Sequence, residues 1–299
     1  MYLLKVIRWR SFPCWAVGEM DTLPIFVRDH AEGQLLAWRR QVEAAELFGV
    51  TLAQVEKVAL ERGILPARYQ RNRKALTVTD QLMLFRSSVA VIGCGGLGGY
   101  VIEELARLGV GRIVVVDPDV FEEHNMNRQL FSSPANLGQA KVQAAAARIN
   151  EINPAVTLVP IQTALSAENG ADLLAGCQVA VDALDSIQVR LELADVCAGL
   201  NIPLVHGAIA GWYGHVTTQH PGDDTLQTIY RSWKTGKGVE ETLGNPSFTP
   251  AMVASLEVAE VCKLLIGQGT TLRGRQLMID LFSMEIHIIN IEEGNRETA

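Results

Sequence analysis

The sequence contains few cysteines, and none of them lies close to another. Cys14, Cys94, Cys177, Cys197 and Cys262 are scattered along 299 residues. Because a four-thiolate zinc site needs cysteines in closely spaced pairs, this distribution predicts no structural zinc. Isolated cysteines are also typical of proteins in a reducing compartment, so we expect a cytoplasmic protein.

Long uncharged apolar runs, internal repeats and low-complexity tracts are absent too. The most apolar long stretch, residues 252–266, contains Glu257, Glu260 and Lys263, which argues against a membrane-spanning helix. The N-terminus lacks a clean apolar core before a cleavage site and does not resemble a signal peptide. With 48% hydrophobic and 20% charged residues, the chain can bury one large core and a smaller appended unit.

The net charge of −7 is unevenly distributed, because residues 1–74 are net positive and the remainder is acidic. This shift predicts an N-terminal extension over residues 1–74 and a main domain over residues 75–299. The extension contains two apolar-periodic segments, residues 34–48 and 52–62, joined at Gly49. We therefore expect a helical hairpin, preceded by a short strand or two before residue 30.

The hairpin has the residue spacing of a helix-turn-helix. Its second helix would expose Glu56 and Glu61, which are poor groups against DNA phosphates. A hairpin that packs on the main domain or on a partner is therefore favoured over DNA binding.

A glycine-rich loop follows a short apolar stretch, residues 89–92, that reads as a buried strand. The loop precedes a predicted helix over residues 98–108, so its backbone N–H groups can approach a phosphate at a helix N-terminus. This arrangement predicts a nucleotide site, although a glycine-rich turn without a ligand is the alternative. The loop glycines are Gly93, Gly95, Gly96 and Gly98.

Asp117 directly follows a second predicted strand, residues 112–116. An acid at that strand tip can accept hydrogen bonds from ribose hydroxyls. The glycine loop and Asp117 together fit NAD and ATP equally well.

Polar residues after Asp117 favour nucleotidyl transfer. Transfer of a nucleotide must stabilise charge on the α-phosphate and on departing pyrophosphate, which cationic side chains do well. Asn125, Asn127, Arg128 and Gln129 follow the second strand, where such sheets bind ligands. Lys141 begins the next predicted helix, residues 141–149.

A third predicted strand, residues 179–185, ends in Asp185, a carboxylate suited to Mg²⁺ beside substrate phosphates. Each residue also has a simpler interpretation. Arg128 and Lys141 can be surface charges, while Asp182 and Asp185 can cap the following helix. Their common order along the chain favours a single active site.

These motifs together resemble the ThiF/MoeB/HesA family of E1-like adenylyltransferases, over about Arg68 to Ile291. The family shares the glycine loop, the acid at the second strand tip, an N-x-x-R-Q segment, a following lysine and a D-x-x-D sequence. The resemblance implies an α/β fold. We expect a Rossmann-like, mostly parallel sheet flanked by helices, an antiparallel C-terminal portion and a small, mainly helical N-terminal extension.

The resemblance also implies roles for individual residues. Arg71 would reach into the site of the partner subunit in a homodimer with composite active sites. Within the site, Gly96 and Asp117 would bind the adenosine half, Asn125 and Arg128 the phosphates, Lys141 the α-phosphate, and Asp185 the magnesium ion, with Ser186 beside it.

Two features of the family are missing from this sequence. Many members carry two C-x-x-C pairs for zinc, but the corresponding positions, residues 226–229 and the C-terminal tail, contain no cysteine. Some relatives use a cysteine in the crossover loop, yet residues 222–250 contain none. Cys94, inside the glycine loop, is interpreted as a small packing residue. We therefore expect the activity to end at the adenylate or to pass it to a separate sulfur donor.

The C-terminal half is predicted to complete the sheet. Residues 203–211 form a further strand, in which Gly207 and Gly211 would leave room for an approaching carrier tail. His206 is interpreted as a hydrogen-bonded core residue rather than a catalytic one. A helix over residues 255–265 and an antiparallel pair, residues 275–281 and 285–291, follow.

The function implied is ATP- and Mg²⁺-dependent adenylylation of the C-terminal glycine of a ubiquitin-like sulfur carrier of the ThiS/MoaD type. Pyrophosphate would be released, and the carrier would end in Gly-Gly. The pathway, whether thiamine, molybdopterin or tungstopterin biosynthesis, stays open. Two alternatives also stay open: adenylylation of a non-protein carboxylate such as a modified tRNA nucleoside, and a non-catalytic nucleotide-sensing regulator.

Overall fold

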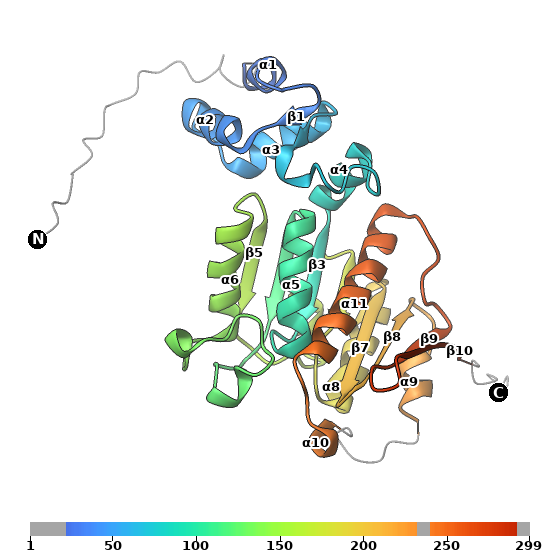
Figure 1. Ribbon diagram of the computed structural model, residues 1–299. Coiled ribbons are helices and arrows are strands. Elements are labelled where there is room, and N and C mark those ends of the chain that lie inside the picture. The colour runs from blue at the N-terminus through green and yellow to red at the C-terminus, as the bar shows by residue number, and fades with distance from the viewer. Residues whose placement is uncertain (1–21, 232–239, 292–299) are drawn as a thin grey trace, which may run out of the picture. The chain divides into compact units, whose positions relative to one another are not determined.

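A computed structural model describes residues 22–231 and 240–291 of the chain (Figure 1). The chain divides into two compact units, Met1–Arg71 and Asn72–Ala299.

The described residues of the first unit form three α-helices around a small apolar core. Gly49, in the left-handed region at φ 62°, ends the second helix, and a capping box between Thr51 and Gln54 starts the third. The expected helical hairpin is therefore present. The elements are α1 (Leu23–Asp29), β1 (Leu35–Leu36), α2 (Trp38–Phe48), α3 (Leu52–Glu61), β2 (Leu65–Pro66) and the 3₁₀ helix η1 (Ala67–Tyr69).

Of the segment before residue 30, in which a short strand or two was expected, Leu23–Asp29 form a helix, and residues 1–21 lie outside the described residues. Another expectation for this unit is wrong. Glu56 does not face outward, because its side chain is buried and accepts a hydrogen bond from the Tyr69 hydroxyl at 2.8 Å. The Arg68 guanidinium, 3.6 Å away, compensates the charge of Glu56.

An eight-stranded sheet forms the centre of the second unit, in the order β10-β9-β8-β7-β6-β3-β4-β5. Strands β3 to β7 are parallel, and β8, β9 and β10 each run antiparallel to the preceding strand. The expected fold class is confirmed. The strands are β3 (Ser88–Ile92), β4 (Arg112–Val116), β5 (Thr157–Ile161), β6 (Val179–Asp182), β7 (Leu204–Ala210), β8 (Tyr213–Gln219), β9 (Arg275–Asp280) and β10 (Glu285–Asn290).

Helices cover both faces of this sheet (Figure 1). Alternate residues of β3 enter two separate cores: Val89 and Val91 pack with α5, α6 and α11, whereas Ala90 and Ile92 pack with α8 and α9. A strand buried on both faces explains the continuous apolar run in the sequence. The helices are α4 (Val78–Arg86), α5 (Gly96–Leu108), α6 (Lys141–Ile152), α7 (Gly170–Leu173), α8 (Ile187–Leu200), α9 (Thr225–Ile229), α10 (Glu240–Leu243) and α11 (Phe248–Ile266), with 3₁₀ helices η2 (Glu123–Asn125) and η3 (Pro134–Asn136).

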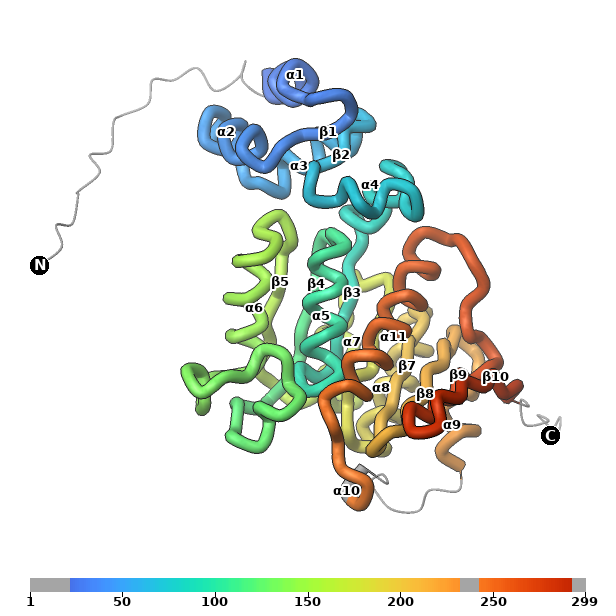
Figure 2. The backbone as a smooth tube through the Cα atoms, viewed as in Figure 1, coloured from blue at the N-terminus to red at the C-terminus, as the bar shows by residue number. Residues whose placement is uncertain are grey.

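The order of the strands reverses beside β3. Figure 2 follows the chain from β3 through α5 to β4 and then through α6 to β5. The chain then crosses to the opposite side of β3, where it forms β6. Ligands bind at such reversals, outside the carboxyl ends of the strands.

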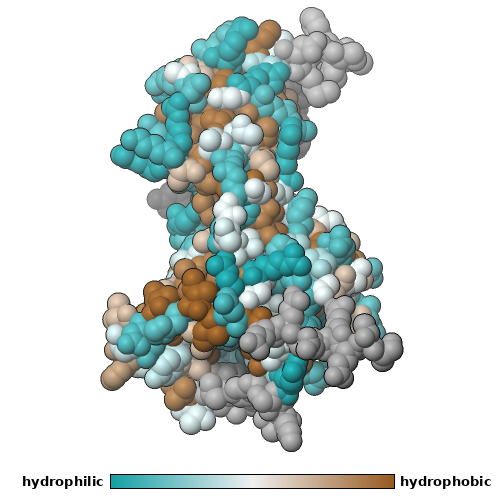
Figure 3. Space-filling model, turned by 90° about the vertical axis from the view of Figure 1, so that its right-hand side faces the viewer, coloured by the Kyte–Doolittle hydropathy of each residue, from teal (hydrophilic) through white to brown (hydrophobic). Residues whose placement is uncertain are grey.

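Apolar side chains are exposed at the β10 edge of the sheet. Phe282, Met284, Ile286 and Ile288 are each more than half exposed, and Figure 3 shows apolar residues gathered on this side. An exposed apolar edge of this kind is suited to contact with another chain. None of the helices that the structure describes is both long and apolar enough to cross a membrane.

Candidate active site

A cleft of about 450 Å³ lies at the reversal of strand order. Its walls come from the segments that directly follow four parallel strands. These are the glycine loop after β3, residues 117–119 after β4, residues 163–165 after β5 and residues 183–186 after β6.

The glycines of the loop perform two different tasks. Gly93 has φ +101°, and a Cβ atom there would lie 2.5 Å from the Ala183 carbonyl oxygen. A Cβ atom on Gly98 would lie 1.9 Å from the Gly93 carbonyl oxygen. These two glycines therefore permit close backbone packing. Gly95 and Gly96 line the cleft, and Cβ atoms there would meet only side-chain atoms, the nearest at 3.6 Å. They keep the start of α5 open to a ligand. Gly98 was predicted to bind the cofactor but does not line the cleft.

Asp117, directly after β4, is buried, and its side chain connects the glycine loop to the end of β4. Its carboxylate accepts hydrogen bonds from the Cys94 amide at 2.7 Å and from the Asp119 amide at 2.8 Å. Burial raises the pKa of Asp117, while the charge of Lys141 and these hydrogen bonds oppose the rise. Asp117 lines the cleft, and its binding of ribose hydroxyls stays a prediction.

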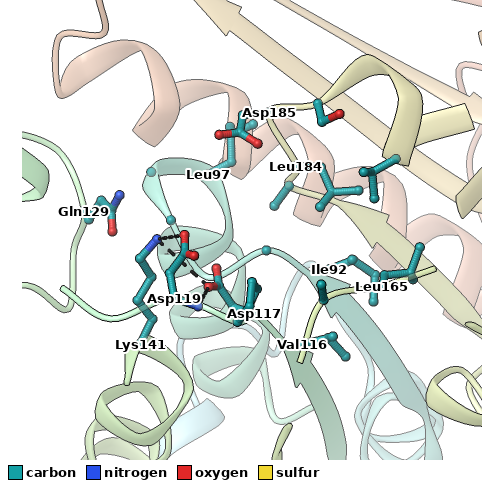
Figure 4. Close-up of a pocket in the computed structure, with 18 of the residues that line it drawn as sticks. Ile92, Leu97, Val116, Asp117, Asp119, Gln129, Lys141, Leu165, Leu184 and Asp185 are labelled. Atoms are coloured by element: carbon teal, nitrogen blue, oxygen red, sulfur yellow. Dashed lines mark hydrogen bonds and ion pairs between the residues drawn. The ribbon is translucent and has the colours of Figure 1, made fainter. Parts of the chain in front are cut away.

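Lys141, the first residue of α6, extends toward the same strand tip (Figure 4). Its Nζ atom lies 2.8 Å from Oδ2 of Asp119 and 4.0 Å from Oδ1 of Asp117. The side chain of Lys141 is buried, and its amino group is held at the cleft wall beside two carboxylates. Asp119 was not predicted from the sequence, although it lies only two residues beyond the strand-tip acid.

The N-x-x-R-Q segment contributes Arg128 and Gln129 to the cleft. Partial burial lowers the pKa of Arg128, and the charge of Asp185 opposes this change. The side-chain oxygen of Gln129 is buried and has no hydrogen-bond partner among the described residues. Because buried polar atoms are normally paired, this oxygen is available to a ligand donor.

Asn125 and Asn127, both predicted to bind the cofactor, do not line the cleft. Oδ1 of Asn125 accepts a hydrogen bond from the Glu122 amide at 3.0 Å and so stabilises the turn. Oδ1 of Asn127 accepts one from Nη1 of Arg128 at 2.9 Å. The two amides support the segment that presents Arg128, and a direct role in binding stays a prediction.

The loop after β6 places Asp185 in the cleft. Strand β6 ends at Asp182, so the expected strand over residues 179–185 is too long. The chain turns away because the Asp182 side chain accepts a hydrogen bond from the Leu184 amide at 3.0 Å. Asp185 is exposed and lines the cleft with Ser186, which is the N-cap residue of α8. Neither Asp182 nor Asp185 caps that helix.

Opposite the charged groups, the cleft has an apolar wall. Ile92, Val116, Leu165 and Leu184 lie on this side in Figure 4, away from Lys141. The segment after β5 and several further lining residues were missed, because no motif marks them in the sequence. They include Thr163, Ala164, Val189, Arg190, Ile209 and Asn245.

Other predicted residues lie outside the cleft. Arg71 is an exposed residue at the end of the first unit, and its role stays a prediction. His206 is fully buried and hydrogen bonded to Asp182, which confirms its interpretation as a core residue. Cys94 is buried within the core, and burial raises the pKa of its thiol, so it is a neutral packing residue.

The expected space beside Gly207 and Gly211 is already filled. A Cβ atom on Gly207 would lie 2.5 Å from the Glu257 carboxyl carbon, and one on Gly211 would lie 3.1 Å from Leu243. The interpretation that these glycines admit a carrier tail is therefore wrong. They accommodate α11 and α10 of the same chain.

The predicted lack of zinc stays a prediction. Residues 226–229 lie in α9, while the tail after residue 291 lies outside the described residues. Across residues 22–231 and 240–291, no group of three or more His, Cys, Asp or Glu residues is placed to hold a metal ion.

Comparison with known proteins agrees with this geometry. The ThiF family model matches residues 69–298. The chain belongs to the ThiF family. The resemblance to the ThiF/MoeB/HesA group is thereby confirmed.

Two curated relatives illustrate the similarity. The SAMP-activating enzyme E1 of Haloferax volcanii is 36% identical over 208 residues, which cover 69% of this chain and 77% of that protein. The adenylyltransferase and sulfurtransferase MOCS3 of Arabidopsis thaliana is 32% identical over 274 residues, covering 88% and 59%. The chain thus spans only about half to three fifths of the MOCS3 proteins from maize and Arabidopsis.

Solved structures share the fold at low sequence identity. A crystal structure of E. coli MccB with ATP has a TM-score of 0.63 at 19% identity, covering 86% of this chain and 83% of that one. A structure of MccB with MccA-N7isoASN reaches 0.67 at 18% identity, covering 86% and 84%.

Proposed function

We propose that this protein is an ATP-dependent adenylyltransferase that activates the C-terminal glycine of a small ubiquitin-like sulfur carrier and releases pyrophosphate. The observation that carries the proposal is the convergence of Lys141, Arg128 and Asp185 on one cleft beside an open glycine loop. Two cations and a carboxylate near a phosphate-binding helix start are the groups that nucleotidyl transfer requires.

The cleft suits ATP along its whole length. The amides of Gly95 and Gly96 at the start of α5 favour phosphate, and the Asp117 carboxylate can accept ribose hydroxyl groups. The apolar wall that contains Val116 and Leu165 suits an adenine ring.

Asp185 fits a magnesium ion that ATP carries. Its carboxylate is exposed to the cleft, and it makes no hydrogen bond or ion pair with any other residue that the structure describes. Mg²⁺ binds through one or two carboxylates together with substrate phosphates, and this is the donor set available here. When bound, the ion would withdraw charge from the phosphate oxygens.

The carrier carboxylate attacks the α-phosphorus in line. A bond forms between this oxygen and phosphorus while the bond to the bridging oxygen of pyrophosphate breaks, and pyrophosphate carries away the electron pair. Lys141 and Arg128 stabilise the charge that grows on the α-phosphate and the leaving group. Arg71 of a second subunit would add a third cation, and no covalent enzyme intermediate is required.

Similarity to relatives supports the choice of substrate. One relative is named as an E1 enzyme that activates SAMP, and the other as an adenylyltransferase and sulfurtransferase. Because residues 222–250 contain no cysteine, sulfur would come from a separate donor. We further propose a cytoplasmic homodimer. The exposed apolar edge at β10 suits a protein partner.

ATP–pyrophosphate exchange tests the proposal. Purified protein should exchange labelled pyrophosphate into ATP only when a carrier ending in Gly-Gly is present, and a carrier lacking its last glycine is the matched control. Exchange supported by a small carboxylate instead would indicate the non-protein substrate. ATP binding without exchange under any of these conditions would indicate a nucleotide-sensing regulator.

A further inference from the structure

Four buried polar side chains from different elements form a continuous hydrogen-bonded chain beside the cleft. Nδ1 of His206 in β7 lies 2.7 Å from Oδ2 of Asp182 in β6. Nε2 of His206 lies 3.0 Å from the Tyr230 hydroxyl, which lies 2.7 Å from Nη1 of Arg190 in α8. All four residues are at most 8% exposed.

One arrangement of protons runs through the whole chain with a neutral histidine. Arginine can only donate and an ionised carboxylate can only accept, so Arg190 donates to Tyr230 and His206 donates to Asp182. With a neutral imidazole, Nε2 of His206 is an acceptor, and the Tyr230 hydroxyl donates to it. Burial lowers the pKa of His206 and favours this neutral form, although Asp182 opposes the change.

Both ends of the chain bind the same backbone residue. Oδ1 of Asp182 accepts a hydrogen bond from the Leu184 amide at 3.0 Å, and Nη2 of Arg190 donates to the Leu184 carbonyl oxygen. Leu184 directly precedes Asp185. We propose that Asp182, His206, Tyr230 and Arg190, here called the Leu184 clamp, position the Asp185 carboxylate for the magnesium ion; this inference rests on the proposed function.

The groups around the clamp leave it electrically balanced. Burial raises the pKa of Glu257 in α11 well above its usual value and lowers that of His215 in β8 well below its usual value, which favours the neutral form of both neighbours. The clamp therefore holds one cation, Arg190, and one anion, Asp182, with Nε and Oδ2 3.9 Å apart. Loss of the Tyr230 hydroxyl removes its hydrogen bonds to Nη1 of Arg190 and Nε2 of His206, and losing hydrogen bonds between buried polar groups is costly.

Tyr230→Phe removes this link while it keeps the aromatic ring. We expect hydrogen exchange at the Leu184 amide, measured by NMR on metal-free protein, to accelerate about tenfold, as expected for loss of one buried hydrogen bond. The magnesium concentration for half-maximal pyrophosphate exchange should rise about tenfold or more, the usual scale for removing a residue that orients a ligand. ATP affinity without metal should stay unchanged. Tyr213→Phe is the matched control, because Tyr213 lines the neighbouring cavity but lies outside the clamp.

His206→Asn provides a second test, because its amide can still donate to Asp182 but is too short to reach Tyr230. It should shift the Leu184 exchange rate and the magnesium requirement in the same direction. Leu184 exchange and magnesium dependence equal to wild type in both variants would overturn the clamp. A fall in kcat without a change in magnesium requirement would overturn it too. The Leu184 exchange rate tests the clamp even if the wild-type protein proves inactive. Inactivity of the wild-type protein would count against the proposed function instead.

Discussion

Alanine substitutions at two glycines should separate the folding of the loop from its binding of nucleotide. Gly93 has a positive φ of +101°, and a Cβ atom added there would lie 2.5 Å from the Ala183 carbonyl oxygen. Gly96 begins α5, and a Cβ atom there would meet only the Arg128 side chain, at 3.6 Å. We therefore expect Gly93→Ala to lower stability and Gly96→Ala to weaken ATP binding.

The magnitudes follow from these contacts. A left-handed conformation costs a non-glycine residue about 1–2 kcal/mol, and forcing an extra carbon into a packed site costs about 1–3 kcal/mol. Gly93→Ala should therefore lose about 2–5 kcal/mol of a total that is typically about 5–15 kcal/mol. In Gly96→Ala, helix propensity favours alanine by up to about 1 kcal/mol, but the methyl group occupies space that phosphate needs, so affinity should fall about tenfold or more.

Urea unfolding and calorimetric ATP titration measure the two effects on the same preparations. The expected outcome is a crossed pattern: Gly93→Ala lowers the urea midpoint of unfolding, while Gly96→Ala is at least as stable as wild type and binds ATP weakly. Unchanged stability in Gly93→Ala would show that the close approach to Ala183 is absent. Unchanged ATP affinity in Gly96→Ala would refute the assignment of this loop to phosphate.

Three further predictions concern the carboxylates and the second subunit. Asp185→Ala should lower pyrophosphate release by about a hundredfold in a steady-state assay without changing the circular dichroism spectrum. If Arg71 acts in the site of the partner subunit, Arg71→Ala and Asp185→Ala should each be inactive alone. Equal amounts refolded together should recover roughly a quarter of wild-type activity, because half of the dimers then hold one intact site. Recovery no greater than the sum of the two variants, in mixtures shown to contain heterodimers, would contradict this role. Burial raises the pKa of Glu257 well above its usual value. The contribution of protonated Glu257 to the free energy of unfolding is therefore fully present below the unfolded pKa of about 4.3, and it is lost as the pH rises toward the folded pKa. Urea unfolding of Glu257→Gln at pH 5 and pH 8 should therefore show a smaller loss of stability with pH than wild type.

The parts of the fold that the sequence predicted are those with strong local signals. Strand β4 and the first residue of α6 appear where predicted, because β-branched runs and helical periodicity depend on nearby residues alone. The last helix is longer than predicted, at Phe248–Ile266, because Pro250 is tolerated in a first turn.

The elements that were not predicted depend on distant partners. Strand β8 contains Thr217 and Thr218, which look polar in the sequence. In the structure, Thr218 donates to a carboxylate oxygen of Glu260 in α11 and Thr217 donates to the Arg275 carbonyl oxygen in β9, so both are buried. Strand β5 lies at the edge of the sheet. Pro160 has no N–H group to donate, and an edge strand tolerates this because one of its sides is not paired with another strand of the sheet. Neither environment can be inferred from residues nearby in the chain.

The same distinction applies to the candidate site. Residues in motifs, such as Lys141 and Arg128, were found because their order along the chain is informative. Asp119 and Arg190 were missed because no motif identifies them. Lys141 meets Asp119 through a backbone hydrogen bond of 3.0 Å, from the Lys141 amide to the Asp119 carbonyl oxygen, as well as through its side chain. That contact exists only once α6 has packed beside the end of β4.

The two carboxylates of the D-x-x-D sequence illustrate how backbone geometry divides a motif into different tasks. Asp182 is the last residue of β6, and its register places it beside His206 of β7, where it is fully buried and hydrogen bonded. Three residues later the chain has left the sheet, so Asp185 is exposed in the cleft. The two residues are of the same type, but of the two only Asp185 is exposed to the cleft and can bind a solvated metal ion beside substrate phosphates. Asp182 instead accepts a hydrogen bond from the Leu184 amide, and it is through this bond that we propose the buried acid positions the exposed one.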